Sequence, residues 1–335
     1  MLVRLLIRTA FSLIAALLVP AAVAQGGTDV PAADARAWLE RIHQAASQRN
    51  YRGTLVFSAA GNVSSSRIAH YCEGPHQYER IDALDGQMRR VFRHDDAVVT
   101  LWPERRIAVL EQRDPRVPFP ALLREGKEGV ADHYDLRLTG EDRIAGHEAK
   151  VMLLQPRDAH RFGQRLWAEK GSGLLLRADI LSPKGDVLES ASFSELALNV
   201  RPQLESVLGP MRKLEGWQVL RRVHARARLE EQGWSLSSPV AGFREISCIK
   251  RALQVVGRER EDAGEVLQTI FSDGLTHVSV FIEPFNAERH HRPMHASVGA
   301  THTLMRRHGE WWITVVGDVP VATLKMFATA LERRR

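Results

Sequence analysis

The sequence has few of the residues and motifs that carry chemistry. Only two of its 335 residues are cysteine, and they lie far apart in the chain. The motifs GxSxG and HExxH are absent, and no glycine-rich phosphate loop is present. The chain therefore lacks the signatures of serine hydrolases, zinc proteases and P-loop nucleotide-binding proteins. We predict that the protein is not an enzyme and that it holds no cofactor and no metal ion.

The two cysteines, Cys72 and Cys248, leave two interpretations open. An oxidising compartment permits a disulfide, but the sequence gives no distance between two residues in what we expect to be different domains. A pair of free, buried thiols is the alternative.

An excess of charge of one sign is also missing. The formal net charge is +6, from 46 Lys and Arg against 40 Asp and Glu. The first 24 residues carry Arg4 and Arg8 and no acid, so the charge without them is +4. Such a small, dispersed excess argues against nucleic-acid binding and suits an acidic partner.

A long apolar run stands at the N-terminus. Arg4 and Arg8 precede apolar residues 10–19, and Ala22-Val23-Ala24 supplies a small-x-small site. This layout predicts a signal peptide at residues 1–24, cleaved after Ala24, and hence an exported protein. A transmembrane anchor is the weaker alternative because the apolar run is short and the cleavage site follows directly.

The first half of the chain predicts one helix and an antiparallel sheet. Apolar residues from Ala35 to Ala46 have helical spacing, and the helix should end near Asn50. A proline-rich stretch at 114–132 is expected to act as a lid over the sheet. Short strands separated by turn signals are expected at residues 54–58, 67–72, 77–82, 88–93, 97–102, 106–112, 134–139 and 148–155.

Residues 165–196 predict a three-stranded meander around which the domain is organised. Leu174, Leu176, Ala178 and Ile180 recur with period two, which would place them on one apolar face. Such a face is covered either by helices or by an apolar ligand. The pattern leaves both interpretations open, core packing and a ligand surface.

The second half predicts a smaller domain after a connector. Residues 201–216 are helical but interrupted by prolines, which suits a linker between domains 28–200 and 217–335. Arginines and a histidine alternate with apolar residues from Arg222 to Leu229, as in a strand with a basic face. That face is either a solvated edge or a docking surface for an acidic peptide. Strands at 267–271, 276–283, 296–305 and 311–316, with a helix after Pro320, would complete a sheet of four to five strands packed by one helix.

One histidine cluster has a spacing that is typical of metal ligands. His290, His291 and His295 form an HHxxxH pattern. No cysteine or positioned carboxylate accompanies them, so we predict no metal there.

Nine stretches, in order, resemble the RseB/MucB family of periplasmic regulators of envelope-stress sigma factors. The resemblance runs over essentially the whole chain after the leader, and its specificity lies in the order of the stretches. They are ARAWLERIHQAASQRNYRGTLVF (35–57), SRIAHY (66–71), ERIDALDG (79–86), RLWAEKGSGLLLRADIL (165–181), LESASFSELALNV (188–200), GWSLSSPVAGF (233–243), FSDGLTHVSVFIEPF (271–285), GAT (299–301) and TVVGDVPVATLKMFA (314–328).

The resemblance implies an α+β fold: a lipoprotein-carrier-like curved antiparallel sheet (a half-barrel) with helical cover, then a smaller α+β domain. It implies a periplasmic protein that binds the periplasmic region of a membrane anti-sigma factor and protects it from proteolysis. Lipid, lipopolysaccharide or lipoprotein acyl chains in the N-terminal cavity would relieve that protection, and dimers are typical. The alternative is a periplasmic lipid or lipoprotein carrier without a signalling partner.

Two sets of residues follow from that expectation. We predict that the lipid cavity is lined by apolar side chains of the strands and the lid: Leu55, Phe57, Phe119, Leu122, Leu123, Met152, Leu154, Leu174, Leu176, Ala178 and Ile180. We predict that the anti-sigma factor contacts basic and apolar residues of the second domain: Arg222, Arg226, Arg228, Phe243, Leu275, Val278 and Trp311.

Overall fold

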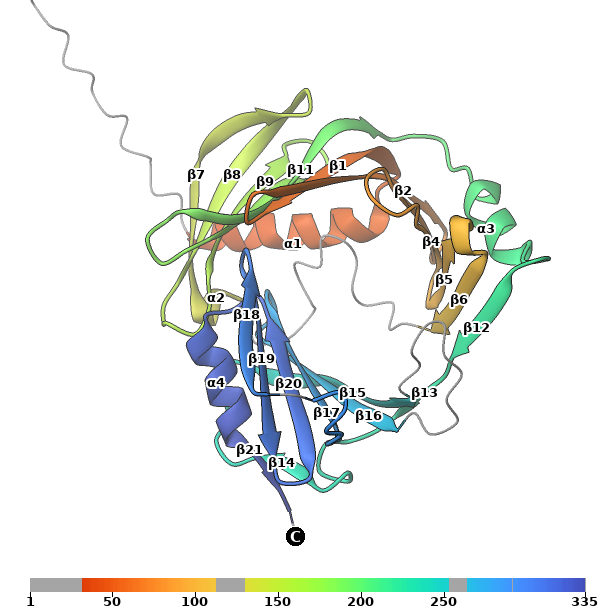
Figure 1. The fold of residues 1–335 in the computed structure, drawn as a ribbon. Helices are drawn as coiled ribbons and strands as arrows, with labels where there is room; N and C mark the ends of the chain where they lie inside the picture. The colour runs from red at the N-terminus through yellow and green to blue at the C-terminus, as the bar shows by residue number, and fades with distance from the viewer. Residues whose placement is uncertain (1–31, 113–129, 253–263, 291, 335) are drawn as a thin grey trace, which may run out of the picture.

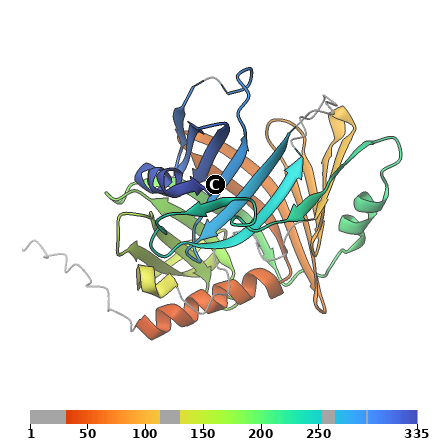
Figure 2. The ribbon, with the colours of Figure 1, turned by 90° about the horizontal axis from the view of Figure 1, so that it is seen from below.

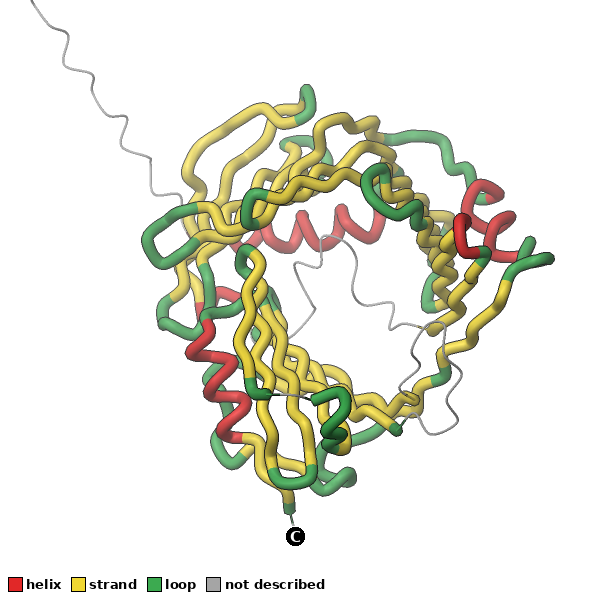
Figure 3. The backbone as a smooth tube through the Cα atoms, in the orientation of Figure 1, coloured by secondary structure: helices red, strands yellow, loops and turns green. Residues whose placement is uncertain are grey.

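Two curved sheets make up most of the computed structural model, which describes residues 32–112, 130–252, 264–290 and 292–334. The larger sheet has 12 strands and the smaller has seven. Figures 1 and 3 show that few helices accompany them. The predicted fold class, an open curved antiparallel sheet with helical cover and a smaller second unit, is confirmed. Within the described ranges, no helix has both the length and the apolar composition that a bilayer crossing requires.

The larger sheet arches over the top of the molecule in Figure 1. Its strand order is β12-β6-β5-β4-β3-β2-β1-β11-β10-β9-β8-β7, and every pair except β12–β6 is antiparallel. The first eleven strands are β1 (Tyr51–Ala59), β2 (Asn62–Glu73), β3 (His76–Ala83), β4 (Arg90–His94), β5 (Ala97–Trp102), β6 (Ile107–Gln112), β7 (Tyr134–Ile144), β8 (His147–Pro156), β9 (Gly163–Glu169), β10 (Leu175–Leu181) and β11 (Val187–Leu198). A 3₁₀ turn, η1 (Pro103–Arg105), and a short helix, α2 (Val130–His133), lie between strands.

Helix α1 (Ala32–Gln48) lies under the arch and covers part of its concave face (Figures 1 and 2). Its buried residues Leu39 and Ile42 belong to one cluster with Met152, Leu154 and Leu166 of the sheet. Burial of a leucine or isoleucine side chain stabilises a fold by about 1.5–3 kcal/mol. The apolar stripe of the sequence is therefore what fastens α1 to the sheet.

The meander predicted at 165–196 forms strands β9, β10 and β11, but its apolar residues do not share one face. The register between β10 and β9 shifts between Leu175 and Arg177, which is a β-bulge. Leu174 and Leu176 consequently belong to a cluster around Trp167 and Phe193, whereas Ala178 packs with Leu175 in the cluster under α1. The prediction of one continuous apolar face was wrong because a single bulged residue reverses the alternation.

The smaller sheet has the order β13-β15-β16-β17-β20-β19-β18. Helix α4 (Val321–Ala330) packs against it, with Leu324 and Phe327 fully buried. This confirms the predicted terminal helix. The strands are β13 (His224–Arg226), β15 (Arg244–Ala252), β16 (Glu265–Ser272), β17 (His277–Pro284), β18 (Met294–Val298), β19 (Thr301–His308) and β20 (Trp311–Gly317), and a separate pair is formed by β14 (Trp234–Leu236) and β21 (Leu331–Arg333).

Three features of the smaller sheet differ from the sequence prediction. The single strand predicted at 296–305 is a hairpin, because Gly299 turns the chain with φ +57° between β18 and β19. Strand β15 was not predicted, and the sheet has seven strands in place of the expected four to five. The basic strand predicted from Arg222 onward is limited to the three residues of β13.

The segment between the two domains is structured and joins both sheets. Helix α3 (Glu205–Arg212) packs against β3 and β4, and β12 (Gln218–Arg222) then runs parallel to β6 at the edge of the larger sheet. After one residue, Val223, β13 pairs with β15 at the edge of the smaller sheet. The expected start of the second domain at residue 217 thus lies beside a strand of the larger sheet.

Candidate functional site

The concave face of the larger sheet is the first candidate, since it carries most of the predicted lipid-cavity residues. The register places Phe57 opposite Ala191, Ala191 opposite Ala178 and Ala178 opposite Leu166, so one apolar row crosses four strands. Met152 continues the row on β8 and is covered by α1. At the open end of the row, Phe57 is 40% exposed.

The remaining predicted cavity residues divide between core and surface. Met152, Leu154, Leu174 and Leu176 are almost completely buried and pack within the hydrophobic clusters, and Leu55 is 8% exposed. Ala178 and Ile180 are half-buried. Phe119, Leu122 and Leu123 lie outside the described residues. The buried members serve as core in this arrangement, so a ligand on this face would first meet Phe57, Ala178 and Ile180.

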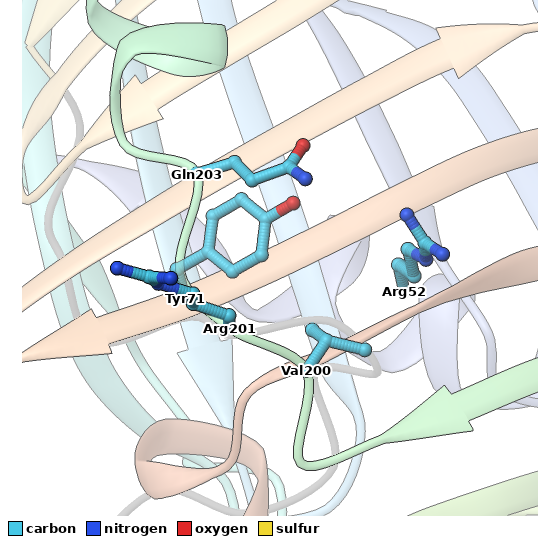
Figure 4. Close-up of a pocket in the computed structure, with 5 residues that line it drawn as sticks. All are labelled: Arg52, Tyr71, Val200, Arg201 and Gln203. Carbon is cyan, nitrogen blue, oxygen red and sulfur yellow. The ribbon is translucent and has the colours of Figure 1, made fainter.

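A pocket of about 270 Å³ lies on the opposite face of strands β1 and β2 (Figure 4). Arg52, Tyr71, Val200, Arg201 and Gln203 line it. In Figure 4 the phenol oxygen of Tyr71 and the amide of Gln203 point to the same region, with Arg52 across from them. The guanidinium group of Arg201 points to the opposite side of Tyr71 (Figure 4), so Arg52 is the cation that faces the phenol and the amide. One guanidinium group with neighbouring hydrogen-bond donors suits a small anionic group. Sequence reasoning missed this pocket, because its residues come from three separate segments.

The two domains are joined by a buried ion pair. Arg161, which precedes β9, donates from Nη1 to Oδ2 of Asp273 over 2.8 Å, and both side chains are fully buried. Its Nη2 donates to the carbonyl oxygen of Ala241 over 2.7 Å, and Nε donates to Asp158. Tyr134 donates its hydroxyl to the same Asp273 oxygen over 3.3 Å. Burial, and next the charge of Asp273, raises the pKa of Tyr134 well above its ordinary value, so the phenol stays protonated.

A second polar contact joins the domains at Glu189 on β11. Its Oε1 accepts the backbone N–H of Ala300 over 2.9 Å and that of Thr301 over 3.2 Å. Burial, and next the negative charge of Asp318, raises the pKa of Glu189. The neighbouring Gly299 lies so close that an added Cβ would stand 2.6 Å from Cγ of Glu189. Only glycine fits this turn without displacing the carboxylate.

The predicted partner-binding residues are not brought together. Arg226 and Arg228 are exposed, and Arg222 lies 3.9 Å from Glu111. Phe243, Leu275 and Val278 are buried, at 6%, 4% and 0% exposure. Phe243 packs under Arg161, and Leu275 belongs to the cluster that includes α1. Their side chains are therefore inaccessible in this arrangement, which corrects the expectation that they form a contact surface.

Trp311 packs beside Trp234, and the described histidines of the cluster lie in separate contacts. Trp311 is half-buried, stands edge-on to Trp234, and has the Arg333 guanidinium over its ring. His290 stacks on Trp312, whereas His295 pairs with His302 over 3.0 Å. His291 lies outside the described residues. The HHxxxH pattern thus does not assemble into one site among its described members.

Both cysteines are free thiols, which settles the question that the sequence left open. Cys248 is buried in the core of the smaller domain, and Cys72 donates to the carbonyl oxygen of Ser47. Burial raises the pKa of each thiol to about 11, with smaller contributions from Glu79 at Cys72 and from Glu245 at Cys248.

Comparison with known proteins gives matches over nearly the whole chain. A family model described as the MucB/RseB N-terminal domain matches residues 34–212, and one described as the MucB/RseB C-terminal domain matches residues 228–332. The sigma factor AlgU regulatory protein MucB of Pseudomonas aeruginosa is 30% identical over an alignment 327 residues long, and the alignment covers 90% of this chain and 92% of that protein. The sigma-E factor regulatory protein RseB of Haemophilus influenzae is 24% identical over 88% of this chain and 90% of its own length.

Solved structures give the same result. A crystal structure of MucB in complex with MucA(peri) aligns with a TM-score of 0.66 and 27% identity, over 90% of this chain and all of that chain. A crystal structure of MucB alone aligns with the same TM-score at 26% identity, over 91% of this chain and 99% of that one.

Proposed function

Because the chain belongs to the MucB/RseB family, we propose that it is a periplasmic regulator of an envelope-stress sigma factor. In this proposal it binds the periplasmic region of a membrane anti-sigma factor and protects that region from proteolysis. The observation that carries the proposal is the alignment of both domains with a MucB chain solved in complex with MucA(peri). We infer that the protein acts by binding and occlusion, without turnover.

The mechanism that fits this geometry is linkage between two ligands. The Arg161–Asp273 pair and the Glu189 contacts hold one arrangement of the domains. If the anti-sigma segment binds this arrangement and a lipid or an acyl chain binds another, each ligand lowers the affinity for the other by the same factor. A coupling of about 2 kcal/mol would weaken partner binding about thirty-fold.

We place the lipid-responsive surface on the concave face of the larger sheet. Phe57, Ala178 and Ile180 are its accessible members, and the apolar row from Phe57 leads toward the cluster under α1. An acyl chain entering along this row would compete with α1 for Met152 and Leu166. We expect Phe57→Asp to reduce the effect of lipid on partner binding while leaving the affinity for the partner itself unchanged.

The partner itself is best tested on the full chain after the leader, residues 25–335. A periplasmic anti-sigma segment of the MucA type should bind it in a pull-down and by calorimetry. The exposed Arg226 and Arg228 are the accessible part of the predicted contact surface, so the double variant Arg226→Glu/Arg228→Glu should weaken binding. Arg212→Glu is the matched control, because Arg212 is also exposed but lies on α3 and pairs with Glu205.

Three outcomes would count against parts of the proposal. If no anti-sigma segment binds, the regulatory function is wrong. If the double arginine variant binds as the wild type does, the partner contacts a different surface. If the protein instead moves lipid between vesicles and shows no partner, the alternative of a lipid or lipoprotein carrier is favoured.

Export and assembly are further parts of the proposal. Mass spectrometry of protein recovered from the periplasm should find a chain that begins at Gln25, after cleavage behind Ala24. We also expect a homodimer, as the family resemblance implies, and light scattering of the purified chain measures its mass directly.

A further inference from the structure

Two imidazoles and a carboxylate meet at one end of the larger sheet. His76 is the first residue of β3, His94 is the last residue of β4, and Asp95 opens the turn after it. His76 Nδ1 lies 2.7 Å from Oδ2 of Asp95, and His94 Nε2 lies 3.5 Å from the same oxygen. The three potential ligand atoms all lie within 4.8 Å of one another. None of these residues belongs to the surfaces assigned to the partner or to lipid.

The surrounding structure holds all three groups in place. Oδ1 of Asp95 accepts the backbone N–H of Gln77 over 2.9 Å, which leaves Oδ2 turned toward both imidazoles. The ring of His94 stacks flat on the buried ring of Tyr78, with centroids 4.6 Å apart and an interplanar angle of 7°. A site built on two paired strands in this way needs little reorganisation to bind an ion.

The Nε2 atom of His94 has no hydrogen bond among the described residues. It is shielded from solvent, and the carboxylate oxygen at 3.5 Å is beyond good bonding geometry. A buried imidazole nitrogen without a partner is costly in an apolar setting. A cation bound between this nitrogen and Oδ2 would remove that cost.

The chemistry of the three donors selects the kind of ion. Two imidazoles with one carboxylate suit borderline transition metals, and zinc sites of this type keep an open position for water. Mg²⁺ and Ca²⁺ prefer oxygen donors. Tetrahedral ligands about 2.0–2.1 Å from Zn²⁺ stand roughly 3.3 Å apart, so the groups need shifts on the order of 1 Å. The His76 side chain is 52% exposed, which gives an ion a way in.

We propose that His76, His94 and Asp95 form a binding site for a divalent transition-metal ion of the Zn²⁺ class. The ion would link the start of β3 to the turn between β4 and β5, and would thereby tighten the part of the sheet on which α3 packs. A simple His–Asp ion pair with no affinity for metal is the competing interpretation. The two differ in whether the chain binds Zn²⁺ stoichiometrically.

The test uses chain 25–335 without an affinity tag, freed of metal by a chelator and titrated with Zn²⁺ alone in a calorimeter. We expect one equivalent to bind with a Kd of about 10 μM or below. At a hundred-fold excess over Kd, the Tm should rise by about 3–5 °C. His76→Ala and Asp95→Asn should each weaken binding at least ten-fold. Co²⁺ in place of Zn²⁺ should give visible absorption bands of a four-coordinate site, and His94→Ala should abolish them.

The chain offers a matched control for histidine content. His295 Nε2 and His302 Nδ1 lie 3.0 Å apart on the smaller sheet and form a second close imidazole pair, and among the described residues no salt bridge joins either ring to a carboxylate. The double variant His295→Ala/His302→Ala should bind Zn²⁺ as the wild type does. The proposal is overturned if the wild type shows no saturable one-equivalent binding, if His76→Ala and Asp95→Asn bind normally, or if the control variant loses the site. Metal-free Tm and circular dichroism of each variant distinguish loss of the site from loss of the fold.

Discussion

Replacing Gly299 by alanine tests the contact between the two domains. Gly299 has φ +57°, and its added Cβ would stand 2.6 Å from Cγ of Glu189 and 3.0 Å from Cβ of Ala59. Glu189 is held by the backbone N–H groups of Ala300 and Thr301, so moving it away breaks hydrogen bonds to a charged group. Such bonds are worth about 1.5–3 kcal/mol, and overpacking in general costs about 1–3 kcal/mol.

Gly309→Ala is the control for the cost of placing alanine in a left-handed backbone conformation. It has φ +59°, yet nothing lies within 4 Å of a Cβ added there. Both substitutions therefore place alanine in a left-handed conformation, which costs about 1–2 kcal/mol, but only Gly299→Ala creates a steric overlap with Glu189. We expect Gly299→Ala to lower the free energy of unfolding by about 1–3 kcal/mol more than Gly309→Ala does.

Urea denaturation followed by tryptophan fluorescence measures both losses. Adding Glu189→Ala to Gly299→Ala should recover part of the deficit, because it vacates the space that the new methyl group needs. Equal losses for Gly299→Ala and Gly309→Ala would refute the reasoning, since the domain contact would then impose no steric demand at this turn.

Three further predictions concern the polar groups at the domain contact and the two cysteines. Asp273→Ala should destabilise the fold by up to about 3–5 kcal/mol, because the buried Arg161 loses the fully buried carboxylate and keeps only its bonds to Asp158 and to the carbonyl oxygen of Ala241. A double-mutant cycle with Arg161→Met, measured by urea denaturation, should show a coupling of about 2–3 kcal/mol, and a coupling near zero would contradict the role of the pair. The pKa of Glu189 is raised in the folded protein, so the free energy of unfolding should fall as pH rises from the ordinary glutamate pKa through the raised value. The Tm of Glu189→Gln should therefore change less between pH 4 and pH 7 than the Tm of the wild type. Cys72 and Cys248, each with its pKa raised to about 11, should react with a thiol reagent at pH 7.5 far more slowly in the native chain than in urea; equal rates would show that burial does not protect them.

Much of the fold was predictable because its signals are local. Helical spacing identified α1 and α4, and short runs between turn residues identified β1 to β6 of the larger sheet. Each signal lies within one element and needs no knowledge of distant residues. One exception is β10, where one bulged residue moves Leu174 and Leu176 off the face that Ala178 occupies. The unpredicted strand β15 and the β18–β19 hairpin are others. A period-two pattern in the sequence does not indicate where a strand contains a bulge.

The candidate sites were less predictable because they combine distant segments. Arg161 and Asp273 are 112 residues apart in the chain, and nothing near either one indicates that the other lies beside it. Tyr71 and Gln203 meet in the pocket for the same kind of reason. Phe243 and Leu275 were expected on a binding surface, and their apolar character explains why the fold buries them instead. Phe243 lies in the core of the smaller domain and Leu275 in the cluster shared with the larger one.

The connection through Val223 sets the mechanics of any domain movement. This residue is 80% exposed and is the whole of the chain between β12, bonded to one sheet, and β13, bonded to the other. If the polar contacts at Arg161 and Glu189 release, the domains stay tethered by a link one residue long. Their effective concentration for each other then remains high, so reclosure is fast and does not depend on protein concentration. A regulator with such a tether resets as soon as the ligand that opened it departs.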